Sequence, residues 1–147
     1  MKKMPPVEKA YEAYSAIADG RVQMHEGSAL VGSSDGAKTY EVAWEGDAYS
    51  STDNATYWQG YPGYPIIAVL ILQGRLPGLA GNLLPELAGI PWNQLNAAHK
   101  RNYAKAVDEA LAGRPHEQEI RAAAEGLHQA LGKLDLTCRR GSPRHAT

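Results

Sequence analysis

The chain has 147 residues, of which 44% are hydrophobic and 21% are charged, and its formal net charge is −1. These values are ordinary for one globular domain and exclude a wholly disordered chain. The single cysteine, Cys138, excludes an internal disulfide and a cysteine-based zinc site within one chain.

The first predicted element is a helix over about residues 7–18, which follows Pro5 and Pro6. Proline suits a first helical turn because the N–H group that it lacks would have no helical partner there. Apolar residues recur at helical spacing along this segment. Glu8 and Glu12 share one face, where we expect solvated carboxylates rather than a catalytic pair.

The N-terminal residues carry positive charge with no apolar run behind them, so we expect no signal peptide. The longest apolar run, residues 66–72, is far shorter than the ~20 residues that span a bilayer. We therefore expect a cytoplasmic protein that makes no contact with membranes.

Four short strands are predicted next, over residues 21–26, 29–32, 38–44 and 47–51. Apolar and polar residues alternate in the third segment, as in a half-buried strand. Turn-forming residues separate the segments. We therefore predict an antiparallel meander of three or four strands.

An aromatic loop follows and leads into the apolar run that begins at Tyr64 and Pro65. Proline near its start and Gly74 just beyond its end predict a buried helix. Two long helices are predicted after it, over about residues 92–112 and 115–131, and a flexible basic tail over residues 137–147.

These elements predict an α+β fold with an N-terminal helix, a small antiparallel meander, a buried helix and two C-terminal helices. We expect a single domain over residues 1–136, in which residues 21–76 form the core and residues 90–134 form the C-terminal helices.

The sequence lacks the glycine-rich phosphate loops, the G-x-S-x-G turn and the H-E-x-x-H helix that mark common enzyme classes. Its five histidines do not have the spacing of metal ligands. We therefore expect no cofactor and no metal, and the missing motifs weigh against an enzyme.

Residues 21–76 resemble the SWIM zinc finger family. In that family a hairpin leads to C-x-C, and a loop then leads to C-x-H at the start of a helix. In this sequence Tyr40-Glu41-Val42 matches the hairpin, and the helix after the loop corresponds to Ile66-Ile67-Ala68-Val69-Leu70. The positions of the four zinc ligands are occupied by Tyr49, Ser51, Gly63 and Pro65.

None of these four side chains is a thiolate or an imidazole, so a structural zinc site of this type is not expected. The resemblance therefore implies a metal-free descendant in which other contacts join the loop to the helix. We expect buried aromatic area to do so, from Tyr49, Tyr57, Trp58, Tyr61 and Tyr64, with the C-terminal helices covering the sheet.

SWIM-like modules bind proteins or DNA, so the resemblance implies a non-enzymatic interaction module. Residues 21–62 hold two bases against six acids, which disfavours phosphates and favours a protein partner. Nucleic acid is the second candidate partner. It would use Lys100, Arg101 and Lys105, with bases stacked on the loop aromatics. Spare apolar surface also suits a homodimer.

The alternative is a small-molecule-binding protein or enzyme with a polar and aromatic site in residues 49–64. Asp53 is the candidate anchor or base, although it also suits the cap of a turn or short helix. A deep cavity beside a buried Asp53 would favour this alternative, and a flat surface would favour the interaction module. The candidate binding residues are Tyr49, Ser51, Asp53, Asn54, Tyr57, Trp58, Tyr61 and Tyr64.

Overall fold

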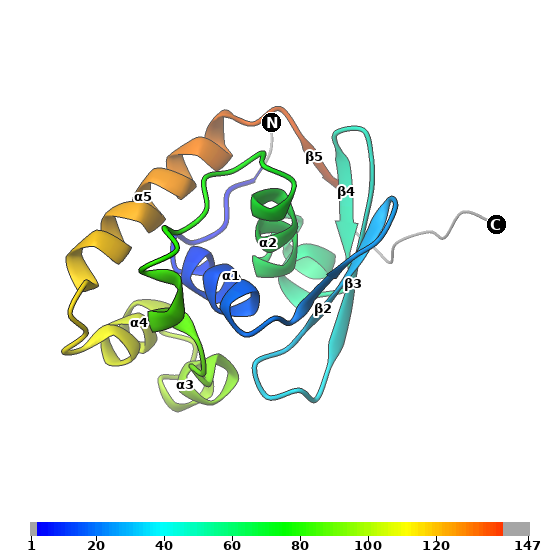
Figure 1. The fold of residues 1–147 in the computed structure, drawn as a ribbon. Helices are drawn as coiled ribbons and strands as arrows, with labels where there is room; N and C mark the ends of the chain where they lie inside the picture. The colour runs from blue at the N-terminus through cyan, green and yellow to red at the C-terminus, as the bar shows by residue number, and fades with distance from the viewer. Residues whose placement is uncertain (1–2, 140–147) are drawn as a thin grey trace.

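The computed structural model describes residues 3–139, and the chain has an α+β fold with a five-stranded sheet beside a group of helices (Figure 1). The elements follow one another as α1 (Lys9–Ala18), β1 (Val22–Met24), β2 (Ser28–Gly32), β3 (Thr39–Glu45), β4 (Ala48–Ser51), the π-helical turn η1 (Ala55–Gln59), α2 (Tyr64–Leu72), the 3₁₀ turn η2 (Leu84–Leu87), α3 (Trp92–Ala98), α4 (Tyr103–Leu111), α5 (Glu117–Lys133) and β5 (Thr137–Arg139).

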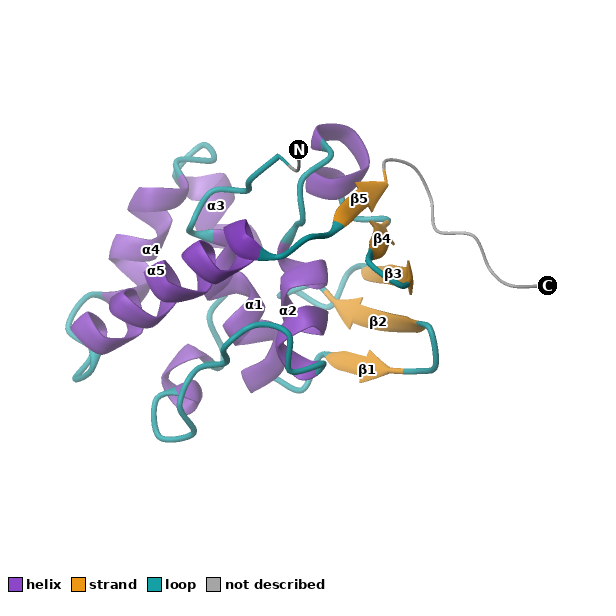
Figure 2. Cartoon of the chain, turned by 90° about the horizontal axis from the view of Figure 1, so that it is seen from above, coloured by secondary structure: helices purple, strands orange, loops and turns teal. Residues whose placement is uncertain are grey.

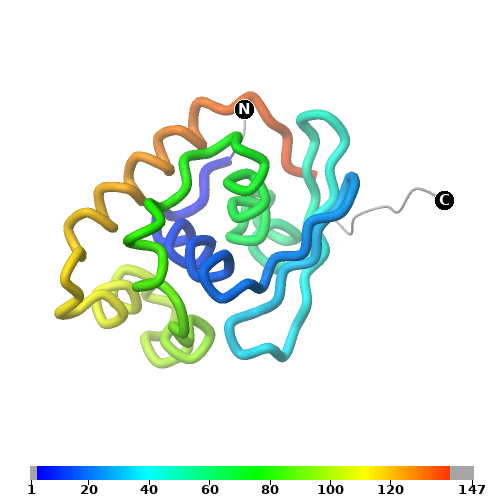
Figure 3. Tube along the Cα trace, in the orientation of Figure 1, coloured from blue at the N-terminus to red at the C-terminus, as the bar shows by residue number. Residues whose placement is uncertain are grey.

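The sheet has the strand order β1-β2-β3-β4-β5. Strands β1 to β4 form the predicted antiparallel meander, and β5 adds a parallel edge strand in which Cys138 pairs with Tyr49. Figure 3 shows the chain returning from α5 to this edge. The prediction of a flexible tail was therefore wrong for residues 137–139, because the open edge of β4 offers backbone groups that these residues pair with. Residues 140–147 lie outside the described part.

The helices lie on one side of the sheet. Helix α2 packs against the sheet and against α1, and α5 lies on the far side of α1 (Figures 1 and 2). The predicted buried helix is confirmed, since residues 66–70 of α2 are each at most 1% exposed. A helix that is apolar on every face is stable only when other elements surround it. The C-terminal helices do not cover the sheet as expected, because α1 and α2 lie between α5 and the sheet.

The predicted long helix over residues 92–112 is wrong. It is broken into α3 and α4, so three helices follow η2 rather than two. Lys100 and Arg101 adopt left-handed φ angles of 53° and 65°, which cost roughly 1–2 kcal/mol per residue outside glycine. Asn102 then caps α4, because its Oδ1 accepts a hydrogen bond from Lys105 N at 3.2 Å. The helical spacing of apolar residues continues across this corner, so the spacing alone does not indicate the break.

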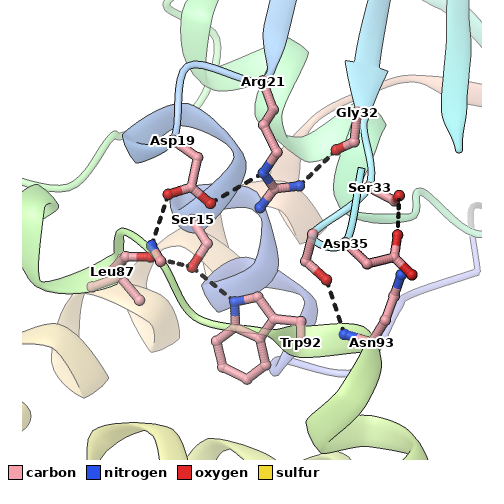
Figure 4. A network of polar contacts seen from close by, with 11 residues as sticks. Ser15, Asp19, Arg21, Gly32, Ser33, Asp35, Leu87, Trp92 and Asn93 are labelled. Carbon is pink, nitrogen blue, oxygen red and sulfur yellow. Dashed lines mark hydrogen bonds and ion pairs between the residues drawn. The ribbon is translucent and has the colours of Figure 1, made fainter. Parts of the chain in front are cut away.

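Polar contacts fix α3 against α1 and the sheet (Figure 4). Ser15 Oγ donates to Leu87 O at 2.6 Å and accepts from Trp92 Nε1 at 2.8 Å. At the start of α3, Asn93 N donates to Ser34 Oγ at 3.0 Å in the turn between β2 and β3. These contacts set α3 and the β2–β3 turn side by side, as two walls of the cleft described next.

Candidate functional site

A cleft of about 750 Å³ lies where α1, the β2–β3 turn, η1 and the α3–α4 corner meet. This volume is within the range of small-molecule sites, roughly 300–1,000 Å³. The cleft is lined by polar and aromatic side chains from all of these elements: Lys9, Glu12, Asp35, Lys38, Tyr40, Asp53, Asn54, Trp58, Gln59, Tyr61, Tyr64, Asn93, Asn96, Arg101 and Tyr103, with Ala37, Ala55 and Ala97. We call it the Asp53 cleft.

The loop between β4 and α2 is held by a chain of side-chain-to-backbone hydrogen bonds. Ser51 Oγ accepts from Asp53 N at 3.3 Å, and Asp53 Oδ2 accepts from Thr56 N at 3.1 Å. Thr56 Oγ1 in turn accepts from Gly63 N at 2.9 Å, directly before α2. The predicted capping role of Asp53 is therefore confirmed, and these contacts connect the end of β4 to the start of α2.

Asp53 has a second carboxyl oxygen, Oδ1, that takes no part in these hydrogen bonds. The residue is 5% exposed and lines the cleft. Among the described residues, no group donates a hydrogen bond to Asp53 Oδ1. A buried acceptor in this state costs roughly 1–3 kcal/mol relative to one with a donor. Asp53 therefore holds a buried acceptor without a donor in a residue that lines the cleft.

A buried ion pair forms part of the cleft wall. Lys9 Nζ lies 3.2 Å from Glu12 Oε2, and the two residues are 8% and 5% exposed. Asn96 Nδ2 donates to Glu12 Oε1 at 3.4 Å, and Lys9 Nζ lies 4.1 Å from the ring centroid of Tyr103. The expectation of a solvated Glu12 was therefore wrong, because α3 and the α3–α4 corner close over this face of α1.

Burial and mutual attraction act on both members of this pair. Burial raises the pKa of Glu12, and the ammonium group of Lys9 opposes part of that rise. Burial acts to lower the pKa of Lys9, but Glu12, with smaller contributions from Tyr103 and Tyr61, outweighs it and holds the pKa of Lys9 above its ordinary value.

Four tyrosines line the same cleft: Tyr40, Tyr61, Tyr64 and Tyr103. The rings of Tyr40 and Tyr64 meet edge to face with centroids 6.2 Å apart. Burial is the main cause that raises the pKa of Tyr40, Tyr61 and Tyr64, and Asp53 adds to the rise for Tyr40 and Tyr61. These hydroxyls therefore stay protonated at neutral pH and are able to donate hydrogen bonds.

Two exposed cations stand at the mouth of the cleft. Lys38 follows the β2–β3 turn, and Arg101 lies at the left-handed α3–α4 corner. The acid of that turn, Asp35, is occupied by local contacts, since its Oδ1 accepts from Ser33 Oγ at 2.7 Å and from Ala37 N at 2.9 Å. The exposed part of the cleft therefore carries two cations and the Asp35 carboxylate, and its buried part carries Lys9, Glu12 and Asp53.

The structure brings part of the predicted site together and leaves part of it elsewhere. Tyr49 is a buried residue of β4, and its hydroxyl donates to Gln73 Oε1 at 2.7 Å, at the end of α2. Ser51 belongs to the loop clamp, and Tyr57, Lys100 and Lys105 are not among the lining residues. The predicted residues that do line the cleft are Asp53, Asn54, Trp58, Tyr61, Tyr64 and Arg101.

The aromatic packing expected of the loop is only partly present. Tyr49 is 1% exposed, but Trp58 is 62% exposed and packs edge to face on Tyr57 with centroids 4.7 Å apart. Hydrogen bonds of Asp53 and Thr56 join the loop to the start of α2, a role that was expected of buried aromatic side chains.

The sequence analysis missed Lys9, Asn96 and Tyr103, and it assigned Glu12 to the surface. The spacing of Lys9 and Glu12 at i,i+3 is a signal for a helical ion pair. Nothing in that spacing distinguishes a buried pair from an exposed one, because the covering residues Asn96 and Tyr103 come from distant helices.

Among the described residues, no group of three or more His, Cys, Asp or Glu side chains is arranged to hold a metal ion. No helix in residues 3–139 is both long and apolar enough to cross a membrane. The cleft combines aromatic ring faces with charged and amide side chains.

Residues 2–137 match the family described as "Uncharacterised conserved protein UCP014422". The chain belongs to this family. No curated protein and no solved structure shows a significant match to the chain.

Proposed function

We propose that this protein binds a small polar molecule in the Asp53 cleft. The observation that carries the proposal is the buried carboxyl of Asp53, whose Oδ1 accepts no hydrogen bond from the described residues. A ligand that donates to this oxygen gains a buried hydrogen bond and removes the cost of an unpaired acceptor.

The remaining lining supports the same function. The hydroxyl groups of Tyr40, Tyr61 and Tyr64 supply donors, and the side-chain amides of Asn93 and Asn96 supply both donors and acceptors. The tyrosine rings offer flat apolar area between these groups. A molecule with several polar groups on a compact body fits this combination.

The proposal is tested with a library of amino acids, nucleosides, sugars and small organic acids, by ligand-observed saturation-transfer NMR. We expect hits whose affinity falls about tenfold or more in Asp53→Asn, the size expected for one buried hydrogen bond. Asparagine keeps an oxygen that accepts from Thr56 N, so the loop clamp is maintained. The matched control is Asp108→Asn, since Asp108 pairs with Arg121 on the surface away from the cleft.

Two results would contradict the proposal. One is a library without any hit at millimolar concentration. The other is a set of hits that Asp53→Asn and Asp108→Asn affect equally, which would place binding outside the Asp53 cleft.

A second candidate function is an interaction module for a protein partner, and the exposure of Trp58 favours it. Exposed tryptophan is enriched at protein interfaces, and here it lies beside Tyr57 at the outer edge of the cleft. A photo-crosslinking amino acid at position 58 should capture a defined partner that the same group at exposed Lys105 does not. Capture of single-stranded nucleic acid, weakened between about 50 and 200 mM salt, would assign the surface to nucleic acid instead.

We also propose that residues 21–76 are a metal-free relative of the SWIM zinc finger. Supporting this, the hairpin, β4 and α2 follow in the family's order, and the Asp53–Thr56–Gly63 hydrogen bonds join strand to helix where zinc would. Elemental analysis of the purified protein should find well under one zinc per chain. One tightly held zinc per chain would contradict the proposal.

A further inference from the structure

We propose that the ligand of the Asp53 cleft is a small zwitterion, an α-amino acid or a short peptide, whose ammonium group binds Asp53 and whose carboxylate binds Arg101. This inference rests on the proposed function and adds the chemical class of the ligand.

The buried carboxyl of Asp53 favours a cationic donor on the ligand. Asp53 is 5% exposed, and its Oδ1 has no donor among the described residues. The buried ammonium group nearby, Lys9 Nζ, is already bound to Glu12 at 3.2 Å. Charge-assisted hydrogen bonds are roughly twice as strong as neutral ones, so an ammonium donor satisfies this carboxyl better than a hydroxyl or amide does.

The aromatic rings near Asp53 also favour an ammonium group on the ligand. Tyr40 and Tyr61 lie close enough to Asp53 for its charge to act on both phenols. Tyrosine rings attract ammonium groups through their negative faces. Two rings of the cleft already have such contacts, since Lys9 Nζ lies 4.1 Å from the ring centroid of Tyr103 and Lys3 Nζ lies 5.8 Å from that of Tyr61.

The two exposed cations of the cleft, Lys38 and Arg101, favour an anionic group on the ligand. Arg101 is exposed at the cleft and is held at the α3–α4 corner, where its backbone N donates to Asn96 O at 2.7 Å. No ion pair with Arg101 or Lys38 is present among the described residues. A planar guanidinium group suits a carboxylate, which it binds through two parallel hydrogen bonds.

The charges of Asp53, Arg101 and Lys38 together disfavour ligands of one charge sign. A polyanion would meet the carboxyl group of Asp53, and a polyamine would meet Arg101 and Lys38. A compact molecule with one group of each sign meets complementary charge from Asp53 and from Arg101, and a cleft of about 750 Å³ has room for it.

The first experiment presents the twenty free amino acids and a set of glycyl dipeptides to the full chain in ligand-observed NMR. The strongest binder is then compared by calorimetry with its N-acetylated form and its carboxamide form. We expect each blocked form to bind about tenfold or more weakly, the size of a charged hydrogen bond.

Variants assign each end of the ligand. Asp53→Asn should weaken the free ligand but leave the N-acetylated form unchanged, and Arg101→Ala should weaken the free ligand but leave the carboxamide unchanged. The matched control is Lys105→Ala, because Lys105 is also exposed and lies four residues after Arg101, outside the cleft.

The outcomes separate this inference from the proposed function. Blocked forms that bind as tightly as the free ligand would overturn the inference. So would Asp53-dependent binding of sugars or nucleosides without any amino acid or dipeptide, although the proposed function would then stand. If neither the zwitterions nor the broader library binds, both proposals fail.

Discussion

A Cβ atom built on Gly63 would lie 2.1 Å from Asp53 Oδ2, far closer than real atoms approach. The φ angle of Gly63 is −76°, which any residue adopts. Glycine is therefore needed at this position for space rather than for backbone freedom, and it allows the start of α2 to pack against the carboxyl that anchors the loop.

Gly63→Ala should destabilise the fold by about 2 kcal/mol, as overpacking of a filled interior does. Urea denaturation followed by tryptophan fluorescence measures the change. Gly126→Ala is the matched control, since a Cβ there meets no atom within 4 Å and position 126 is exposed in the middle of α5. It should stabilise the protein by about 0.5–1 kcal/mol. Equal effects of the two substitutions would show that the Asp53 contact is not tight.

Removing one member of the buried ion pair should cost more than removing both. Lys9→Met leaves the Glu12 carboxyl buried without its cation, and we expect a loss of about 3 kcal/mol. The double variant Lys9→Met with Glu12→Leu should recover part of this loss, because apolar side chains tolerate burial. Denaturation at pH 7 measures both. A double variant as unstable as the sum of its single changes would contradict this account.

The same pair predicts how stability changes with alkali. The pKa of Lys9 is raised in the folded protein, mainly by Glu12 acting against burial. The folded state therefore holds this proton more tightly than the unfolded state, and the stability that it confers is present below the unfolded pKa of 10.5. It should be lost as the pH rises through the folded pKa. Thermal melts from pH 9 upward should show this decline in the wild type and a shallower one in Lys9→Met.

Asp35 predicts the opposite behaviour in acid. The backbone N–H of Ala37, followed by the Ser33 hydroxyl, lowers the pKa of Asp35 from 3.8 to about 2. Its contribution to stability is therefore present above pH 3.8 and is lost as the pH falls towards 2. In an NMR titration of the Asp35 carboxyl carbon, Ser33→Ala should move the pKa of Asp35 upward. An unchanged pKa would assign the shift to the backbone N–H of Ala37 and the side chain of Asn93.

The left-handed corner between α3 and α4 predicts a stabilising substitution. Lys100 has a φ angle of 53° and does not line the cleft. Lys100→Gly should relieve the strain of the left-handed backbone, and part of this gain is offset because glycine makes the unfolded chain more flexible. The net effect should be a stabilisation of about 0.5–1 kcal/mol. Lys105→Gly, within α4, should destabilise it by about 0.5 kcal/mol. Calorimetric melting temperatures compare the two, and a destabilised Lys100→Gly would contradict the strain argument.

The sequence was sufficient where local pattern and tertiary packing agree. Alternation in residues 38–44 predicted β3, and Pro65 ahead of an apolar run predicted α2, because both segments bury the faces that their periodicity marks. Asp53 was identified from its place among loop residues that bond nearby backbone, and the structure finds it both in that role and beside a cleft.

The remainder depended on contacts between distant segments. Glu12 is spaced like a surface glutamate, and only the packing of α3 and Asn96 makes it a buried one. At Lys100, intrinsic preferences oppose the observed backbone, so the cap at Asn102 was the sole local signal for the corner. The cleft joins residues from both halves of the chain. A pattern read along a short stretch of sequence does not show that such distant residues come together.

The parallel pairing of β5 with β4 has a consequence for biosynthesis. Strand β4 leaves the ribosome early, but its outer edge stays unpaired until α5 has emerged and residues 137–139 arrive. During that interval the meander presents an open row of backbone donors and acceptors, the form in which nascent sheets associate with one another. Chains interrupted within α5 should therefore be the ones that chaperones retain and that aggregate when chaperones are scarce.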